Sequence, residues 1–549
     1  MKKESLEQVP SYVQKIYLYG PPGSGKTSIG EILAENLALP FVDLDQRIES
    51  LAGISIPQIF DRRGESGFRQ IEKQVLQEVS KMNWGVIALG GGALLDPESR
   101  ILVEKSGSLI CLTASRDMLF ERLSSTQVKR PLIEQSGDHS PEFVRLENLL
   151  AQRSAHYASF ADQVETGTGS PQQVAREIQI RLGVFHVRGM AGRAFPDHGN
   201  ETEAERPQTL GYDVRISSML NQIGAALRLR GMAGPVALVT DQNVADHYLN
   251  RVKKSLLAAG FSTRSITLSP GESTKTMLTL SSLWQEFLEA GLERKSTVVV
   301  LGGGVVGDLA GFAAATYLRG IAWVNVPTSL LAMVDASLGG KTGIDLPAGK
   351  NLAGAFHAPQ IVLVEPSTLL TLPLAEQRSG MAEVIKAGVI GDPVLFDLCR
   401  REWQEIEAGW DEIVPRSMAV KVDIIEADPY EKGLRAVLNY GHTVGHAVEV
   451  LSNYTLRHGE AVSIGMVAEA RLAEEIGLAK EGLTDEIRDA CQQIGLPVEI
   501  PGDYLPEEII KTMQVDKKRA DGKVKFALPI KIGEVSPGIE VNDFEPIFK

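Results

Sequence analysis

The sequence predicts an α/β fold built from two nucleotide-binding units joined end to end. Short apolar strands alternate with amphipathic helices in both halves, which is typical of parallel sheets covered by helices. One glycine-rich loop follows the first strand at residues 20–27, and another, Gly302–Gly304, follows a strand near the middle. The chain has 549 residues, which is too long for one core and indicates about three or four domains of ~150 residues.

The composition narrows the class of protein. A net charge of −14 argues against nucleic-acid binding, which needs a basic surface. Three widely spaced cysteines form no disulfide framework, and the N-terminus lacks the apolar run of a signal peptide. The apolar stretch 298–318 contains five glycines and Asp308, so we expect a strand, a turn and a helix there instead of a membrane span. We therefore expect a cytoplasmic protein that binds small molecules, and neither nucleic acid nor membrane.

The first half is expected to form one domain over residues 1–185, a parallel sheet with helices on both faces. Its expected elements are strands at 15–19, 85–89 and 108–112 and helices at 26–37 and 171–182. Residues 186–208 are polar, rich in glycine, proline and acids, and have no period. We expect this stretch to be a linker.

The second half is expected to contain two subdomains with a cleft between them. Strands expected at 236–240, 264–268 and 298–301 predict a Rossmann-like subdomain over 209–365. Beyond residue 366 long periodic helices dominate and predict a helical subdomain over 366–549. The clearest of these helices are expected at 375–390, 413–427, 436–451 and 459–476.

The loop from Gly20 to Thr27 matches the pattern G-x-x-x-x-G-K-[ST], after a strand and before a helix. Its N–H groups and the helix N-terminus attract phosphates, Lys26 reaches the β- and γ-phosphates, and Thr27 is expected to bind Mg²⁺. The expected ATP-binding residues are Gly20, Gly23, Ser24, Gly25, Lys26, Thr27 and Ser28.

Polar residues after the next strands indicate the phosphate acceptor. Asp43 and Asp45 follow a short apolar strand, and alternation predicts that both carboxylates lie on the same side. One can accept hydrogen bonds from a hydroxylated substrate, and the other can help to hold Mg²⁺ through water. Arg69 can clamp a carboxylate with two hydrogen bonds, and Gly90–Gly92 lets a ligand approach the backbone closely.

Two further arginines complete this set, Arg130 in a polar stretch that can serve as a lid and Arg153 on a helix. In combination these motifs resemble shikimate kinase over residues 14–182. The resemblance implies ATP- and Mg²⁺-dependent phosphorylation of shikimate at its 3-hydroxyl, with Arg130 at the ATP. It assigns catalysis to Lys26, Asp45 and Arg130. Shikimate binding would involve Asp45, Arg69, Gly91, Gly92 and Arg153. The alternatives are a gluconate-type or nucleotide kinase, or a nucleotide-binding module without catalysis.

The second glycine loop indicates a dinucleotide. Gly302–Gly307 satisfies G-x-G-x-x-G, but the acid expected about 20 residues later is missing. Asp241 follows another strand and can bind a ribose hydroxyl. The acid would then precede the glycine loop in the sequence, which is an unusual order for a dinucleotide site. Lys341, Lys350 and Asn351 lie among glycines and suit an oxyanion pocket.

A divalent metal is indicated by Glu383, His442, His446 and His458. His442 and His446 are four residues apart and share one helix face. Two histidines and one glutamate with an open position form a common catalytic zinc set, although a helical histidine pair alone is more often structural. From the residues alone, which histidines bind the metal stays open.

Residues 209–549 resemble 3-dehydroquinate synthase. The motifs that carry the resemblance are Gly302-Gly-Gly-Val-Val-Gly-Asp308, Glu383-x-x-Lys386 and Arg435-x-x-x-Asn439-x-x-His442-x-x-x-His446. It implies conversion of 3-deoxy-D-arabino-heptulosonate 7-phosphate to 3-dehydroquinate and phosphate, with NAD and Zn²⁺ or Co²⁺. The alternatives are a related sugar-phosphate cyclase and a metal-dependent polyol dehydrogenase.

The resemblance also assigns residues. The metal ligands are Glu383, His442 and His458, which leaves His446 to the substrate. The NAD-binding residues are Asp241, Asn243, Glu272, Lys275, Gly303, Gly304, Val305, Asp308, Thr328, Ser329, Asp335 and Lys350. The heptulosonate-phosphate-binding residues are Arg319, Lys341, Asn351, Lys386, Lys421, Arg435, Asn439, His446 and Lys517, of which Lys341, Lys386, Lys421 and His446 are catalytic. We expect a homodimer through this half, with Arg319 reaching the pocket of a partner subunit.

Overall fold

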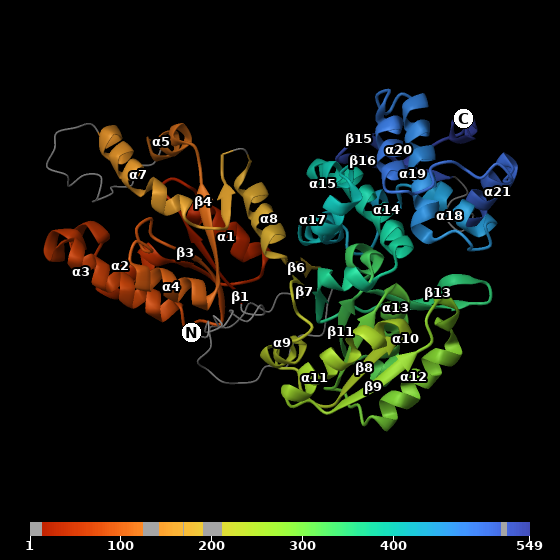
Figure 1. Cartoon of the computed structure of the whole chain (residues 1–549), viewed down its shortest axis with the longest axis horizontal. Helices are drawn as coiled ribbons and strands as arrows, with labels where there is room; N and C mark the ends of the chain where they lie inside the picture. The colour runs from red at the N-terminus through yellow and green to blue at the C-terminus, as the bar shows by residue number, and fades with distance from the viewer. Residues whose placement is uncertain (1–13, 125–141, 168, 190–210, 518–523, 549) are drawn as a thin grey trace. The chain divides into compact units, whose positions relative to one another are not determined.

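The computed structural model describes residues 14–124, 142–167, 169–189, 211–517 and 524–548 of the chain (Figure 1). These residues form two compact units, of which the first ends at Val184 and the second begins at Phe185. Within the described ranges, no helix combines the length and the apolar character that crossing a membrane requires.

The first unit is built on a parallel sheet with the strand order β2-β3-β1-β4-β5. Its strands are β1 (Gln14–Tyr19), β2 (Phe41–Asp43), β3 (Trp84–Ala88), β4 (Ser108–Thr113) and β5 (Gln163–Glu165). Its helices are α1 (Lys26–Asn36), α2 (Leu44–Ala52), α3 (Ile56–Val79), α4 (Pro97–Ser106), α5 (Arg116–Ser124), α7 (Glu142–Ala158) and α8 (Pro171–Leu182).

Helices cover both faces of this sheet, as the side chains of β1 show. Tyr17 and Tyr19 pack on one side, in a core shared with α2 and α3. Ile16 and Leu18 pack on the other side, in a core shared with α1 and α8. This alternation is that of a strand buried on both faces, and it confirms the expected arrangement of the first half.

The second unit contains a larger sheet with the order β6-β7-β14-β11-β10-β8-β9. Its strands are β6 (Val184–Arg188), β7 (Gly211–Ile216), β8 (Val236–Asp241), β9 (Thr263–Leu268), β10 (Thr297–Gly302), β11 (Ala322–Pro327) and β14 (Ile361–Val364). An antiparallel hairpin, β12 (Lys341–Leu346) and β13 (Gly349–Phe356), lies outside this sheet. The helices of this part are α9 (Ile223–Leu229), α10 (Gln242–Val244), α11 (Asn250–Ala258), α12 (Met277–Glu289) and α13 (Gly304–Thr316), with π-helical turns at Ala245–Leu249 and Ala332–Ala336 and 3-10 turns at Glu272–Thr274 and Tyr317–Arg319.

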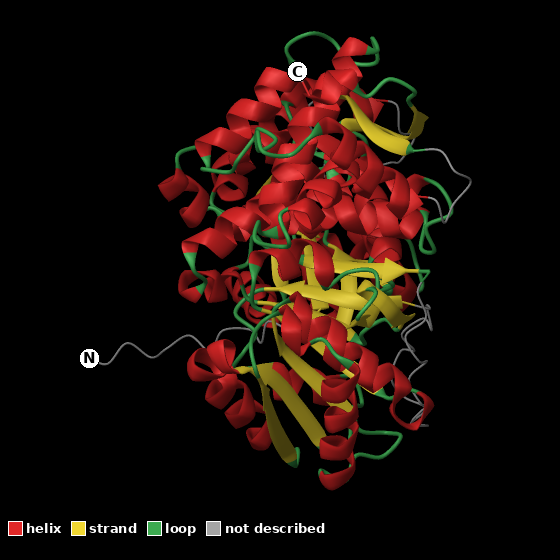
Figure 2. Ribbon diagram, turned by 90° about the vertical axis from the view of Figure 1, so that its right-hand side faces the viewer, coloured by secondary structure: helices red, strands yellow, loops and turns green. Residues whose placement is uncertain are grey.

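The rest of the second unit is a helical part, in which helices predominate (Figure 2). It begins with 3-10 turns at Pro366–Thr371 and also contains 3-10 turns at Leu434–Asn439 and Glu545–Phe548. Its helices are α14 (Leu374–Gly391), α15 (Pro393–Cys399), α16 (Trp403–Ala408), α17 (Trp410–Ala427), α18 (His442–Leu451), α19 (His458–Glu475), α20 (Leu483–Gln493) and α21 (Pro506–Lys517). One antiparallel pair, β15 (Lys525–Lys531) and β16 (Glu534–Glu540), packs among them through Phe526 and Leu528.

Most of the predicted helices and strands are confirmed, and the prediction of one helix is wrong. The strand, turn and helix expected over 298–318 are β10 and α13. The helix expected over 436–451 is broken, because Gly441 takes a left-handed φ of 77° and only α18 follows it. His442 is therefore the first residue of a helix and lies next to a break in the chain's regular structure.

The expected linker also needs correction at its start. Helix α8 ends at Leu182, Gly183 caps it with a left-handed φ of 61°, and β6 begins at Val184. β6 pairs with β7, so the sequence joins the first unit's last helix directly to a strand of the second unit's sheet. Residues 186–188 belong to that strand. Its Phe185 and Val187 are fully buried, unlike the exposed residues of a linker. The stretch 190–208 lies outside the described residues.

Candidate functional site

The first unit presents a phosphate-binding loop at the end of β1. Lys26 donates from Nζ to the carbonyls of Gly20 and Pro21 at 2.9 and 3.0 Å, so its ammonium lies over the loop. Thr27 donates from Oγ1 to Asp43 Oδ2 at 2.8 Å, which pairs the expected Mg²⁺ ligand with a carboxylate. Among the other predicted residues of this loop, Ser24 is buried and Ser28 is exposed.

The two aspartates after β2 have different surroundings. Asp43 is the N-cap of α2, and its Oδ1 accepts hydrogen bonds from the N–H groups of Asp45 and Gln46. Asp45 lies in the first turn of that helix, so the prediction that strand alternation aligns the two carboxylates is wrong. Strand β2 ends at Asp43, and helical geometry sets the direction of Asp45.

The triple glycine after β3 brings the predicted acceptor residues together. A Cβ atom on Gly90 would lie 3.0 Å from Asp45 Oδ1, and one on Gly92 would lie 2.7 Å from Arg69 Nη2. The carbonyl of Gly91 accepts from Arg153 Nη1 at 3.3 Å and from Tyr157 Oη at 2.7 Å. Residues from three helices, α2, α3 and α7, thus meet at one stretch of glycine backbone, where the missing Cβ atoms leave room for a close approach.

Arg69 is held in place by two acids. Its Nη1 lies 2.6 Å from Glu72 Oε2 and its Nη2 lies 3.2 Å from Glu65 Oε1. Burial raises the pKa of Glu72, although the charge of Arg69 opposes this shift. Arg69 keeps 27% of its side chain exposed, which leaves donors for a ligand. Arg130 lies outside the described residues.

The second unit contains a cavity of about 1370 Å³ between its sheet and its helical part. This volume exceeds the ~300–1,000 Å³ of ordinary small-molecule sites, so the cavity suits two ligands at once. The lining includes many of the predicted NAD-binding residues: Asp241, Asn243, Glu272, Lys275, Gly303, Gly304, Val305, Asp308, Ser329, Asp335 and Lys350. It also includes seven predicted substrate-binding residues: Lys341, Asn351, Lys386, Lys421, Arg435, Asn439 and His446.

Three of the predicted NAD- and substrate-binding residues are not brought into this lining. Thr328 is buried and donates its N–H to the Gly302 carbonyl at 3.0 Å. Arg319 is exposed at a turn with a left-handed φ of 66°. The backbone of Lys517 ends α21, but its side chain lies outside the described residues.

Glu383, His442 and His458 form a cluster suited to a metal ion. Nε2 of each histidine lies 3.6 Å from Glu383 Oε1, and one ligand atom from each residue falls within 4.8 Å of the others. Glu383 is 3% exposed, and its Oε1 makes no hydrogen bond to any described residue. A buried carboxylate oxygen without a donor is costly, and a divalent cation between these three atoms would satisfy it.

The other ring nitrogens of these histidines are anchored by the protein. His442 Nδ1 lies 3.2 Å from the carbonyl of Tyr440, and His458 Nδ1 lies 3.3 Å from Glu449 Oε2. A proton on each Nδ1 leaves the lone pair of Nε2 directed at the cluster. His446 is part of the same group of rings but is not one of this set of three.

Charges around the cluster shift its pKa values in opposite directions. Burial opposes ionisation of Glu383, but Lys386 and the two imidazoles outweigh it and hold its pKa well below the usual range. Burial and the charge of Lys386 hold the pKa of His442 well below its usual value. Burial also works against protonation of His458, yet the carboxylates of Glu383 and Glu449 raise its pKa to about 9.

Buried lysines lie beside the metal cluster. Lys386 forms an ion pair with Glu383 and donates to the carbonyl of Leu438 at 2.9 Å. Lys421 donates to Asp335 Oδ1 at 2.5 Å and to the same residue's carbonyl at 2.7 Å. Burial lowers the pKa of Lys421, although the charge of Asp335 opposes this. A lysine with a lowered pKa can exchange a proton near neutral pH more readily than an exposed one.

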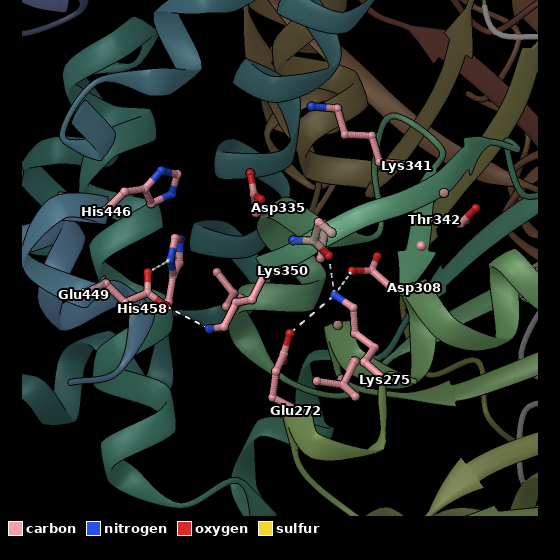
Figure 3. Close-up of a pocket in the computed structure, with 18 of the residues that line it drawn as sticks. Glu272, Lys275, Asp308, Asp335, Lys341, Thr342, Lys350, His446, Glu449 and His458 are labelled. Carbon is pink, nitrogen blue, oxygen red and sulfur yellow. Dashed lines mark hydrogen bonds and ion pairs between the residues drawn. The ribbon is translucent and has the colours of Figure 1, made fainter. Parts of the chain in front are cut away.

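Lys275 organises the other side of the cavity, where the dinucleotide is expected (Figure 3). Its Nζ lies 2.9 Å from Asp308 Oδ2, 3.4 Å from Glu272 Oε1 and 2.5 Å from Asn351 Oδ1. The last contact holds Asn351, whose φ is 55°, and Asp345 accepts the N–H of Asn351 at 2.7 Å. The predicted NAD and substrate residues are therefore linked by one buried ammonium.

Two acids in the site were missed by the sequence analysis. Glu431 pairs with Lys341 at 2.5 Å and with Arg435 Nε at 3.3 Å. Glu449 lies between Lys350 and His458. The sequence signal for Glu449 was its position seven residues after His442 and three after His446, on the same face of α18. Glu431 lies in a loop, where periodicity gives no signal.

Comparison with known proteins yields matches in both units. The family described as shikimate kinase matches residues 22–182, and the families described as 3-dehydroquinate synthase N-terminal and C-terminal match residues 265–379 and 380–519. The 3-dehydroquinate synthase of Nostoc punctiforme is 48% identical over 341 residues, which is 60% of this chain and 93% of that protein. That of Geobacter metallireducens is 48% identical over 331 residues, 59% of this chain and 92% of that protein.

One solved structure adds a likeness in fold. It is 2-epi-5-epi-valiolone synthase from Streptomyces hygroscopicus with NAD⁺ and Zn²⁺ bound. It is 27% identical, has a TM-score of 0.57, and the match covers 61% of this chain and 94% of that one.

Proposed function

We propose roles for these residues from the premise that the chain belongs to the 3-dehydroquinate synthase family and carries a shikimate kinase domain before it. The chain is a bifunctional enzyme of the shikimate pathway. One half phosphorylates shikimate at its 3-hydroxyl with ATP and Mg²⁺, and the other converts 3-deoxy-D-arabino-heptulosonate 7-phosphate to 3-dehydroquinate and phosphate with NAD and a divalent metal.

In the kinase half, we assign ATP to the loop from Gly20 to Ser28 and shikimate to the glycine stretch after β3. Arg69 and Arg153 would bind the substrate carboxylate, and Asp45 would orient the hydroxyl toward ATP. Phosphoryl transfer depends mainly on positioning and on neutralising charge, which Lys26 and Mg²⁺ at Thr27 supply. An Arg69→Ala variant should lose affinity for shikimate while keeping its affinity for ATP. Equal losses for both ligands would contradict the assignment.

In the synthase half, the observation that carries the assignment is the buried oxygen of Glu383 facing two histidine nitrogens at equal distance. A divalent metal held by Glu383, His442 and His458 would polarise a substrate hydroxyl, and a bound NAD⁺ would accept a hydride and return it. Lys341, Arg435 and Asn351 would hold the anionic groups of the substrate. Lys386 and His446 would hold or move protons of the substrate.

A spectroscopic assay tests this assignment against a polyol dehydrogenase. Because the hydride is returned, NAD⁺ should not be consumed, and phosphate release should proceed without accumulation of NADH. A stoichiometric rise of NADH absorbance during turnover would contradict a synthase. Metal analysis of the purified chain, compared with a Glu383→Gln variant, tests the ligand set independently of turnover.

We also propose that the synthase half works as a homodimer in the cytoplasm. Arg319 is exposed and outside the cavity of its own chain, so a second copy would use it. Mixing two inactive variants, Arg319→Ala and Lys386→Ala, should restore part of the activity if each site takes Arg319 from its partner. No recovery after subunit exchange would contradict the shared site. The cytoplasmic location is supported by three buried cysteines that form no disulfide, Cys111, Cys399 and Cys491.

A further inference from the structure

Glu449 connects two parts of the synthase cavity that have different tasks (Figure 3). It lies on α18, and its side chain is 10% exposed. Its Oε1 is 3.1 Å from the ammonium of Lys350 on β13. Its Oε2 is 3.3 Å from Nδ1 of His458, the first residue of α19. One carboxylate thus reaches a residue assigned to NAD and a residue assigned to the metal.

On the metal side, Glu449 fixes the form of the histidine ring. When Nδ1 of His458 donates to Glu449, Nε2 carries the lone pair and faces Glu383 Oε1 at 3.6 Å. A carboxylate behind a ligating imidazole sets its tautomer and strengthens it as a ligand, and loss of such a partner typically costs about 10–100-fold in metal affinity.

On the dinucleotide side, Glu449 restrains a long and otherwise flexible side chain. The ammonium of Lys350 lies 4.1 Å from the centroid of the Tyr454 ring as well as against Glu449. The two oxygens of Glu449 therefore have separate partners: Oε1 forms an ion pair with Lys350 at 3.1 Å, and Oε2 faces Nδ1 of His458 at 3.3 Å. A carboxylate in this position can hold both partners at once.

We propose that Glu449 is a positioning residue through which metal binding and NAD binding strengthen each other. This inference rests on the proposed synthase function. With a metal bound at this cluster, the His458 ring would be held in place and would in turn hold Glu449. Glu449 would then hold Lys350 at the dinucleotide site, so that NAD binding would cost less side-chain entropy. Because coupling between binding sites is reciprocal, NAD⁺ must improve metal affinity by the same factor.

The test is a set of binding measurements on the full-length chain stripped of metal. Co²⁺ affinity is measured by competition with a chromogenic chelator, with and without saturating NAD⁺, and NAD⁺ affinity is measured with and without Co²⁺. We expect NAD⁺ to strengthen Co²⁺ binding roughly fivefold in the unaltered chain, within the usual range of coupling between sites. The matched control is Glu286→Gln, which removes an exposed acid paired with Arg264 in the same unit. It should leave every constant unchanged.

Two substitutions separate the two halves of the proposal. In Glu449→Gln the amide oxygen still accepts from His458, while the amide NH₂ faces Lys350. Co²⁺ affinity should stay within about threefold of the unaltered chain, and the coupling factor should fall to about one. In Glu449→Ala both contacts are lost, so Co²⁺ affinity should fall about 10–100-fold and the coupling should disappear as well.

Each other outcome overturns the inference. Coupling that survives in Glu449→Gln shows that the Lys350 contact carries none of it. Co²⁺ affinity that falls as far in Glu449→Gln as in Glu449→Ala makes Glu449 a direct ligand in the neighbouring group with His446 and His458. An unaltered chain that binds both ligands without coupling overturns this inference alone. An unaltered chain that binds neither ligand overturns the proposed function and the inference with it.

Discussion

Glu469 Oε2 accepts a hydrogen bond from the backbone N–H of Gly441 at 2.7 Å. The other oxygen of Glu469 accepts from the N–H of Val444 at 3.1 Å, and the residue is fully buried in α19. The first N–H groups of a helix have no partner within the helix, and a negative charge stabilises that end. Glu469 therefore fixes the start of α18, where His442 is the first residue.

Replacing Glu469 by alanine should weaken both the fold and the metal site. Two buried N–H groups would lose their acceptor, which should lower the free energy of unfolding by about 2–3 kcal/mol. Adding metal should shift the thermal transition of the synthase half, which identifies that transition. Its midpoint in the variant measures the loss of stability, and competition with a chelator measures metal affinity. Glu469→Gln keeps one acceptor oxygen and should lose less in both measurements. Equal stability of the alanine variant and the unaltered chain would contradict the capping role.

Removing the divalent metal should silence one activity and spare the other. Glu383 Oε1 has no hydrogen-bond partner among the described residues, so we expect a cation to occupy this cluster. The kinase residues described above are not part of it. After treatment with a chelator and return to buffer with Mg²⁺ alone, synthase activity should be lost and kinase activity retained. Added Zn²⁺ or Co²⁺ should restore the synthase. A kinase that also stays inactive would show that the two halves depend on each other for folding.

The sequence was most informative where a local pattern determines the structure. The loop before Lys26, the strands around Gly302 and the long helices α14 and α19 follow from apolar periodicity and from glycines at fixed spacing. The resemblance to two families then placed side chains that are distant in sequence in the same cavity. No periodicity in the sequence indicates that Asp241 and Lys350 lie in one cavity. The prediction of this part of the site therefore rested on the resemblance to the families and not on the residue pattern.

The errors occurred where contacts distant in sequence override the local pattern. Gly441 ends the apolar periodicity of 436–451 because the close approach of α19 requires a residue without a Cβ. Asp45 lies in a helix because Asp43 is the N-cap of α2, which begins at the next residue. The polar stretch after α8 looked like a linker from 186 onward, but pairing with β7 makes residues 184–188 a strand. Glu449 was missed because its importance lies in two partners from other elements.

The position of β6 predicts where the chain can be divided. His186 Nδ1 lies 2.6 Å from Asp213 Oδ1, and both side chains are almost fully buried. A fragment of residues 184–549 keeps this pair and should fold and retain synthase activity. A fragment of residues 210–549 lacks β6 and leaves a buried carboxylate without that donor, so its thermal midpoint should fall by several degrees. Equal midpoints for the two fragments would show that β6 adds nothing to the sheet.

Alkaline pH should destabilise the kinase half through a buried thiol. Burial raises the pKa of Cys111 to about 11, although the charge of Lys26 opposes this shift. In the unfolded chain the thiol ionises near its ordinary pKa of about 8.5. Above that pH the unfolded state releases a proton that the folded state keeps, so stability is complete below pH ~8.5 and falls between ~8.5 and ~11.

The substitution Cys111→Ala isolates this contribution. Between pH 8 and pH 10 the unfolding free energy of the unaltered chain should fall more steeply than that of the variant, by up to about 1.4 kcal/mol per pH unit above ~8.5. Tyr19, whose pKa is also raised by burial, is common to both chains and cancels in the comparison. Parallel slopes in chemical denaturation at each pH would contradict the thiol's role.

The substitution Gly92→Ala should displace Arg69 without disturbing the rest of the kinase. The new Cβ would lie 2.7 Å from Nη2 and 3.0 Å from Nη1 of the guanidinium, which is the movable end of a long side chain. The guanidinium must shift, and a charge-assisted contact to the substrate carboxylate worth about 1.5–3 kcal/mol would weaken. The KM for shikimate should rise roughly tenfold, while the KM for ATP and the thermal midpoint change little.

Because both changes act on one group, Gly92→Ala combined with Arg69→Ala should cost no more than Arg69→Ala alone. Additive losses in that double variant would mean that Gly92 contacts the substrate directly and does not act by leaving room for Arg69.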